Sequence, residues 1–272
     1  MHELRLLDVT LDTFSRAVGI SFDDKLARAE ALAASGIDVL DTGEPLAVPG
    51  KLLLVREIAH QVRAVAVAAR AQANMQDIQT AWRAIGKAEQ PVLRICSQIS
   101  DWHRQERLRV SEQILLQHLR AMLAYARQFC PTVELVALDA TRCQEAFLCQ
   151  VIETAISIGA RTVTLVDSVG YALPFEYRAL FRTVVEQGAG SKTMLLGTQA
   201  HNRDGYALDN TLAAICAGAR LVTVDESSGG HLGRADLAAA LQRQRTQQHT
   251  DGISTREDPL QPKDIQHRHT AW

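Results

Sequence analysis

Polar side chains that could bind a ligand or transfer a proton follow short apolar runs of this chain, at the point where each run ends. The run 163–166 is one of them, and it ends on Asp167 and Ser168. The other residues in such positions are Asp8, Thr10, Asp41, Thr42, Asp139, Gln199, His201, Asn202, Asp225 and Glu226. Carboxylates and imidazoles are the usual general acids and bases of enzymes. If the runs are parallel strands, their carboxyl ends converge, and these side chains are expected to meet at one mouth.

The apolar runs alternate with segments of helical periodicity. An unbroken run of Val, Leu and Thr such as 163–166 is typical of a strand that is buried on both faces. The expected strands are residues 4–9, 37–40, 65–69, 91–95, 133–137, 163–166, 193–197 and 221–224. The expected helices are residues 21–36, 53–62, 74–85, 111–127, 144–158, a segment beginning at Pro174, 207–217 and about 234–246. Each strand is followed by a helix, which predicts an α/β protein with a (β/α)8 TIM barrel.

A doubly wound open sheet would show the same alternation of strands and helices. No G-x-G-x-x-G motif follows the first expected strand, and this favours the barrel. We expect residues 1–246 to form the barrel domain. Residues 247–272 are polar and have little to bury, so they are expected to be an irregular tail or an interaction arm.

Composition excludes several classes of function. The 272 residues are 47% hydrophobic, enough for one large core, and the formal net charge of −2 gives no basic footprint for nucleic acid or for an anionic membrane surface. The 5 cysteines include no C-x-x-C pair, so neither a disulfide framework nor a thiolate zinc site is expected, and we expect all of them in the core. No apolar run approaches about 18 residues, and MHELRLLDVT lacks the pattern of a signal peptide. We therefore expect a cytoplasmic protein without a membrane partner.

Five motifs, in order along residues 4–237, carry a family resemblance. They are LLDVTLDTFSRAVGIS leading to IDVLDTGEP, then SDWH, LDATR, VDSVGYALP and AHNRDG. Together they resemble the 2-isopropylmalate synthase, homocitrate synthase and hydroxymethylglutaryl-CoA lyase family. The resemblance implies a TIM barrel that makes or breaks a carbon–carbon bond next to the carbonyl group of a small 2-oxo acid, commonly with acetyl-CoA. A small carboxylate or 2-oxo acid, acyl-CoA and a second copy in a homodimer are the partners that it implies.

The resemblance also implies a divalent metal bound by an Asp, two His at H-x-H spacing and an Asn. This sequence departs from that set. The position of the family's catalytic Arg is taken by Asp12, the metal-binding Asp by Thr13, the first His by Gln199 and the Asn by Arg234, while the second His is kept as His201. The acid that follows the fifth strand is also lost, at Leu138. We therefore predict no metal at the family's position. A shifted site of Asp12, His201 and Glu226 is the alternative, which Arg234 disfavours because it would repel a cation.

The remaining polar residues are assigned expected roles. Asp12, Asp139 and His201 are the candidates for catalysis, and Arg94, Ser168, Asn202 and Arg234 are the candidates for binding a substrate. Each has a structural alternative. Arg94 could pair with Asp12 or Asp139, Arg234 could form a plain salt bridge, and His201 could hold a loop. The aspartates at strand ends, including Asp8, Asp41 and Asp167, could cap loops. We expect His231, His267 and His269 to be solvated.

Two functions of different classes stay open. The first is a diverged acyltransferase or carbon–carbon lyase. The second is a non-catalytic relative, a pseudoenzyme that binds a metabolite or a partner protein such as a complete synthase. Long synthases of the family carry further domains after the barrel that help to complete the acyl-CoA site, whereas here only the polar tail follows residue 246. A smaller substrate, a partner chain or abandoned catalysis would each account for that difference.

Overall fold

The computed structural model describes residues 3–17, 19–46, 48–189, 194–226 and 230–250. The chain divides into two compact units, Met1–Arg234 and Ala235–Trp272, and each is described by itself. The first unit is a barrel. In the second, helix α9 (Arg234–Thr250) continues past residue 246, and residues 251–272 of the expected tail lie outside the described part of the chain. The predicted domain boundary at residue 246 stays a prediction.

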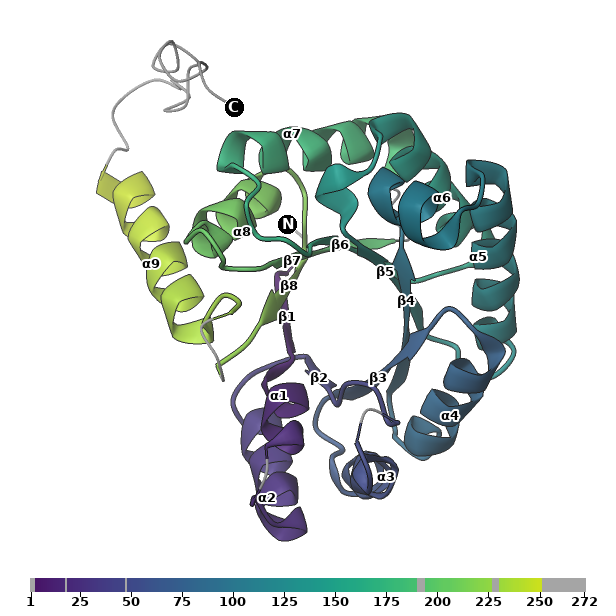
Figure 1. Cartoon of the computed structure of the whole chain (residues 1–272). Helices are drawn as coiled ribbons and strands as arrows, with labels where there is room; N and C mark the ends of the chain where they lie inside the picture. The colour runs from purple at the N-terminus through teal and green to yellow at the C-terminus, as the bar shows by residue number, and fades with distance from the viewer. Residues whose placement is uncertain (1–2, 18, 47, 190–193, 227–229, 251–272) are drawn as a thin grey trace. The chain divides into compact units, whose positions relative to one another are not determined.

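Eight parallel strands close into a barrel in the order β1 to β8, and β8 pairs with β1. Figure 1 shows the ring of strands with the helices of this unit around it. The strands are β1 Arg5–Asp8, β2 Val39–Asp41, β3 Ala66–Gln72, β4 Pro91–Gln98, β5 Val133–Leu138, β6 Thr162–Asp167, β7 Leu195–Ala200 and β8 Leu221–Val224. The predicted TIM barrel is confirmed.

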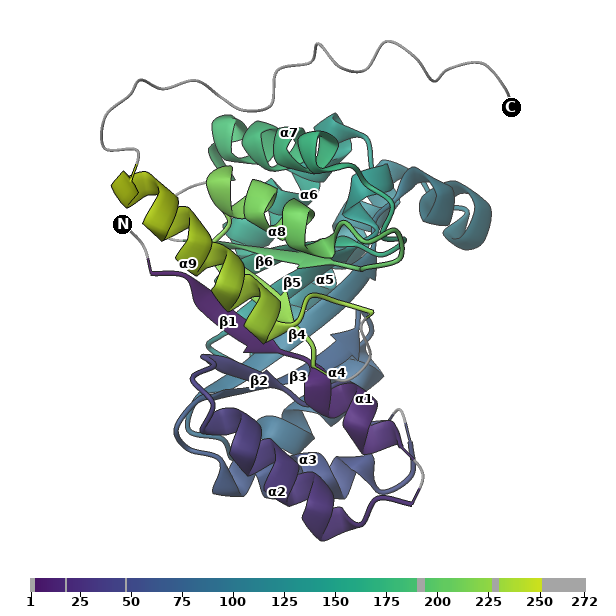
Figure 2. The same ribbon diagram turned by 90° about the vertical axis from the view of Figure 1, so that its left-hand side faces the viewer.

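The helices cover the outer face of the strands, which explains why β6 is buried along its whole length. They are α1 Thr10–Arg16, α2 Phe22–Ala33, α3 Lys51–Gln61, α4 Met75–Ile85, α5 Glu112–Arg127, α6 Glu145–Ile158, α7 Pro174–Val184 and α8 Ala207–Cys216, with short turns η1 His103–Leu108, η2 Ala140–Arg142 and η3 Val185–Ala189. In Figure 2 α7 and α8 lie against each other on one side of the barrel.

The predicted helix starts are set by capping side chains. The side chains of Ser21, Asn74 and Ser111 each accept a hydrogen bond from the backbone N–H three residues on. Helix α1 was not predicted; it begins directly after β1 and carries Asp12. The seventh strand was placed too early, at residues 193–197. It extends to Ala200 because its pairing with β6 continues to Asp167.

The inside of the barrel combines an apolar layer with a charged layer. Cys96, Val136 and Val166 pack together, with Leu138 against them. Arg94 and Glu134 are cross-strand partners on β4 and β5 and are almost completely buried. Four of the five cysteines are buried as expected, but Cys216, near the end of α8, is exposed, which corrects the prediction that all lie in the core.

Candidate functional site

A cavity of about 250 Å³ opens at the carboxyl ends of the strands, where the site of a parallel barrel lies. We call it the mouth cavity. It is lined by Val9, Asp12, Thr13, Arg70, Leu138, Val166, Ser168, Gln199, His201, Asp225 and His231. Three candidate residues, Asp12, Ser168 and His201, therefore line one cavity. Ser168 and His201 follow strand ends as the sequence indicated, whereas Asp12 lies in α1.

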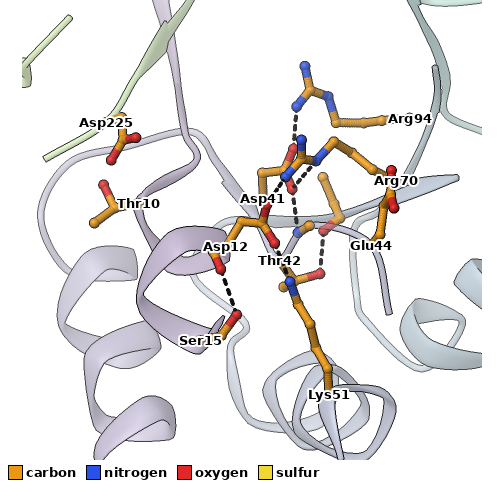
Figure 3. A network of polar contacts seen from close by, with 12 residues as sticks. Thr10, Asp12, Ser15, Asp41, Thr42, Glu44, Lys51, Arg70, Arg94 and Asp225 are labelled. Atoms are coloured by element: carbon orange, nitrogen blue, oxygen red, sulfur yellow. Dashed lines mark hydrogen bonds and ion pairs between the residues drawn. The ribbon is translucent and has the colours of Figure 1, made fainter. Parts of the chain in front are cut away.

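Asp12 lies between two cations. Its Oδ1 accepts a hydrogen bond from Nζ of Lys51, the first residue of α3, and its Oδ2 accepts one from Nη2 of Arg70 on β3. Figure 3 shows Arg70 reaching across both Asp12 and Asp41. The Nε atom of Arg70 is 3.4 Å from Oδ1 of Asp41. Burial lowers the pKa of Arg70, but the charges of Asp41 and Asp12 outweigh burial and raise it, so Arg70 is fully charged.

Arg94 lies below this cluster and not at the cavity surface. Its side chain is 1% exposed, Nη1 donates to Asp41, and Nη2 donates to Glu134 at 2.9 Å. Glu134 also accepts a hydrogen bond from Thr164 Oγ1 at 2.8 Å. The predicted contact of Arg94 with a substrate stays a prediction, and it would require these buried ion pairs to open. The pairing partners expected from the sequence, Asp12 and Asp139, are replaced by Asp41 and Glu134.

Alternating charges thus run from the mouth into the barrel. We call this set the ion-pair chain, and it consists of Lys51, Asp12, Arg70, Asp41, Arg94 and Glu134. Lys51 and Arg70 were not among the candidates predicted from the sequence. A possible signal was present for Arg70, because it is the one charged residue of the strand AVAARAQ. Lys51 could not be found in this way, because a lysine at the start of a helix has no distinctive pattern.

His201 meets a second histidine in the mouth cavity. The Nε2 atoms of His201 and His231 are 3.1 Å apart, and Nδ1 of His231 is 3.2 Å from Oδ2 of Asp225. Burial and the neighbouring His231 lower the pKa of His201 to about 4, so its imidazole is neutral at pH 7. The expectation that His231 is solvated is wrong, because its side chain is only 17% exposed and has these partners. His267 and His269 lie outside the described residues.

Asp139 and Ser168 belong to a neighbouring loop cluster. Oδ2 of Asp139 is 2.5 Å from Nη2 of Arg142 and 3.3 Å from Nδ1 of His103. Burial raises the pKa of Asp139, but hydrogen bonds from Arg142 and Ser100 outweigh it and lower that pKa. Ser168 Oγ accepts a hydrogen bond from the backbone N–H of Asp139 at 2.9 Å. Asp139 does not line the mouth cavity, whereas Ser168 does.

Asn202 and Arg234 make structural contacts. Asn202 Oδ1 accepts a hydrogen bond from the N–H of Ala207 at 3.2 Å, at the start of α8. Arg234 donates to the carbonyl of Ser35 at 2.7 Å and pairs with Glu226 at 3.0 Å, which is the salt bridge that the sequence analysis gave as its alternative role. Neither residue lines the mouth cavity, and their roles in substrate binding stay predictions.

Most of the aspartates at the strand ends cap loops, as the sequence suggested. Asp8, Asp41 and Asp167 each accept a hydrogen bond from a backbone N–H two or three residues on, at 2.8, 2.5 and 3.0 Å. Gly170 in the loop after β6 has φ of 78°, and a Cβ there would lie 2.8 Å from the carbonyl oxygen of His201. The loop after β6 therefore packs tightly against the end of β7 and fixes the place of His201.

The closed barrel with polar side chains at its mouth defines the class of fold, a (β/α)8 barrel. The HMGL-like family model matches residues 3–257, and the chain belongs to this family. It is 38% identical over 219 residues to 2-isopropylmalate synthase of Pelotomaculum thermopropionicum, covering 80% of this chain and 43% of the relative. It is 35% identical over 257 residues to 2-isopropylmalate synthase of Methylobacterium nodulans, covering 92% of this chain and 49% of the relative. The chain thus spans about half the length of these curated relatives.

Solved structures confirm the fold. Hydroxymethylglutaryl-CoA lyase from Pseudomonas aeruginosa is similar with a TM-score of 0.72 at 19% identity, covering 89% of this chain and 86% of that chain. An HMG-CoA lyase from Acenitobacter baumannii in complex with coenzyme A and 3-methylmalate has a TM-score of 0.70 at 17% identity, covering 89% and 84%. In this chain, no helix of the described part is both long and apolar enough to cross a membrane.

The family is metal-dependent, but the residues that this structure describes do not fit a divalent cation at the mouth. Each carboxylate oxygen of Asp12 accepts from a cationic side chain, and the guanidinium of Arg234 is bound to Ser35 and Glu226. In the alternative set of Asp12, His201 and Glu226, the carboxylate of Glu226 pairs with Arg28 and Arg234 and does not line the mouth cavity. No group of three His, Cys, Asp or Glu side chains that could hold a metal ion occurs within the described ranges.

Proposed function

We propose that the mouth cavity binds a small 2-oxo acid, and that the chain makes or breaks a carbon–carbon bond next to its carbonyl group as an acyltransferase or lyase. In this proposal no divalent cation is held at the family's position. Membership of the HMGL-like family supports the reaction class. The named relatives are 2-isopropylmalate synthases, and one structural neighbour was solved with coenzyme A and a small dicarboxylic acid.

Arg70 is the group best placed to bind the carboxylate of such a substrate. It lines the mouth cavity, its side chain is 23% exposed, and its charge is secured by Asp12 and Asp41. A guanidinium presents several N–H donors in one plane, which suits a carboxylate. The single observation that carries the proposal is that Arg70 and the neutral imidazole of His201 line the same cavity.

His201 is the proposed proton carrier. When a carbon–carbon bond forms next to a carbonyl group, a proton leaves the attacking carbon and the new alkoxide gains one. A neutral imidazole can accept the first proton and return one to the oxygen. The low pKa of about 4 keeps His201 in the accepting form at neutral pH. In this arrangement Asp12 holds the guanidinium of Arg70 through an ion pair.

The test combines binding with turnover. Calorimetry with pyruvate and with oxalate, a planar mimic of a 2-oxo acid, should give a dissociation constant for the wild type, and Arg70→Met should weaken binding at least tenfold. Arg63→Met is the matched control, because Arg63 lies in an exposed ion pair with Glu89. Chromatographic detection of free CoA from acetyl-CoA, with a panel of 2-oxo acids and with excess EDTA, tests the reaction. Binding of no 2-oxo acid together with no product would contradict the proposal.

One observation favours the alternative, a non-catalytic relative that binds a metabolite or a partner protein. Asp12, a predicted catalytic residue, has both carboxylate oxygens in ion pairs. If this is the function, Arg70→Met should weaken the binding of carboxylates as much as in the enzyme proposal. No combination of acetyl-CoA and a 2-oxo acid should then release CoA. The two candidates therefore separate on turnover and not on binding.

A further inference from the structure

A second cavity opens at the opposite end of the barrel from the mouth cavity, where the strands begin. Its volume is about 360 Å³, against about 250 Å³ for the mouth cavity. Its lining comes from the beginnings of all eight strands. We call it the amino-end cavity. The site of a parallel barrel lies at the carboxyl ends of the strands, so the proposed reaction gives this cavity no role.

Glu134 is the buried charge of the amino-end cavity. It lines the cavity and is 2% exposed. Its Oε1 atom takes both hydrogen bonds of the carboxylate, from Arg94 at 2.9 Å and from Thr164 at 2.8 Å. Among the residues that the structure describes, no group donates a hydrogen bond to Oε2 of Glu134. Each oxygen of a carboxylate can accept hydrogen bonds, so Oε2 is an open acceptor for a ligand in the cavity.

The lining indicates which ligand chemistry fits. Part of the wall is apolar, because Val39, Leu195 and Leu221 line the cavity and pack together. Hydrogen bonds to a carboxylate are strongest when the donor is a cation. A metal ion would need several more ligands, and the described part of the chain holds no group of three His, Cys, Asp or Glu that could supply them. An ammonium or guanidinium group on a short hydrocarbon chain matches both the acceptor and the wall.

Two further charged residues, Arg5 and Asp38, line the rim of this cavity. Both are exposed, and Oδ2 of Asp38 accepts a hydrogen bond from the backbone N–H of Leu6 at 2.7 Å. Exposed charges are screened by water and salt, whereas a buried charge is screened much less. Glu134 is therefore the charge that should decide which ligand binds inside.

We propose that the amino-end cavity binds a small organic cation that donates to Oε2 of Glu134, and that the ion-pair chain links this site to the mouth cavity. Glu134 is the last member of that chain, and Arg70 lines the mouth cavity. A cation on Glu134 competes with Arg94 for the carboxylate, so Arg94 binds Asp41 more strongly. Asp41 then holds Arg70 less, which frees the guanidinium for a carboxylate ligand. The link rests on the proposed function, whereas binding of the cation does not.

Calorimetric titration of the full chain with n-butylguanidinium tests the site. We expect saturable binding of one cation per chain, and no comparable binding of butyrate or 1-butanol. Glu134→Gln should weaken binding roughly tenfold or more, because an amide nitrogen donates where the carboxylate oxygen accepts. Glu186→Gln is the matched control and should change nothing, because Glu186 is 68% exposed and pairs only loosely with Arg182, at 3.8 Å.

A second variant decides the test if Glu134→Gln does not fold. Ala66 lines the amino-end cavity and lies on the same face of β3 as Arg70, four residues further on. Ala66→Leu should fill part of the cavity and weaken the binding of n-butylguanidinium, while every charge of the ion-pair chain is kept. Unchanged affinity in either variant, or equally tight binding of 1-butanol, would overturn the site.

The link to the mouth cavity has two measurements of its own. Saturating n-butylguanidinium should tighten the binding of oxalate about fivefold, and oxalate should tighten the binding of n-butylguanidinium by the same factor. In the chain labelled with ¹⁵N-arginine, n-butylguanidinium alone should shift the Nε signals of Arg94 and Arg70, which Arg70→Met helps to assign. An Arg70 signal that stays in place would overturn the link. If oxalate does not bind, the proposed function fails, while the cation titration and these spectra still decide the inference.

Discussion

Asp12 and Lys51 form an ion pair across 39 residues of sequence, and it joins α1 to the first residue of α3 at the mouth of the barrel. The Lys51 side chain is 1% exposed and that of Asp12 is 11% exposed. Both groups have lost their hydration, so each depends on the other and on Arg70. The negative charge of Asp12 at the mouth cavity is therefore balanced by two cations of the same chain, Lys51 and Arg70.

Lys51→Met should destabilise the barrel by about 3 kcal/mol, because it leaves the buried carboxylate of Asp12 with one cation in place of two. Urea unfolding measures the change. Lys87→Met, away from the buried ion pairs, is the control and should change the free energy of unfolding by less than about 0.5 kcal/mol. Adding Asp12→Asn to Lys51→Met should cost less than the sum of the two single changes. Strict additivity would show that the two residues do not interact.

Gly43→Ala should disturb this same ion pair from the backbone side. Gly43 has φ of +76°, and a Cβ there would lie 2.7 Å from Nζ of Lys51. Gly36 has a similar φ of +87° with no atom within 4 Å, which makes Gly36→Ala a matched control. Gly36→Ala should cost roughly 1 kcal/mol for the left-handed backbone, and Gly43→Ala roughly 1 to 3 kcal/mol more for the overlap. If urea unfolding showed the same loss of stability for both variants, the side chains around Gly43 would be able to move aside without cost.

His201 should make the barrel less stable in acid. Its pKa is about 4 in the folded protein and 6.5 in the unfolded chain, so between these values the unfolded chain binds more protons. The free energy of unfolding therefore falls as pH is lowered through this window, and above about 6.5 the effect is absent. His201→Gln keeps an N–H donor without the titration, and its stability should depend less on pH between 4 and 6.5. Parallel curves for wild type and variant, from thermal unfolding, would contradict the low pKa.

Among the five cysteines, Cys216 should react fastest with a thiol reagent. It is exposed, whereas Cys96, Cys130, Cys143 and Cys149 are buried. Burial raises the pKa of the Cys96 and Cys143 thiols to about 12, which suppresses the reactive thiolate. A chromogenic disulfide reagent should titrate one thiol rapidly in the native protein and five in denaturant. Cys216→Ser should remove the rapid phase, and a second fast thiol in that variant would show that a buried cysteine is accessible.

The sequence by itself determined the architecture. Apolar runs such as 163–166 mark the strands, and N-caps at Ser21, Asn74 and Ser111 mark helix starts. These signals are local in sequence, and their regular alternation predicts the barrel that the structure shows. The capping role of Asp8, Asp41 and Asp167 was also predictable, since each carboxylate accepts from an N–H a few residues away. Closure of the barrel then brings Asp12, Ser168 and His201 to one cavity.

Only the tertiary structure decided which groups face each other there. Asp12 is 58 residues from Arg70, and His201 is 30 residues from His231, so no spacing in the sequence links them. Arg94 was recognised as a candidate, but its partners Asp41 and Glu134 depend on the register of neighbouring strands. The exposed position of Cys216 and the half-buried position of His231 were missed for the same reason. Local sequence specifies where a strand ends, whereas charge partners and burial depend on how the separate ends are brought together.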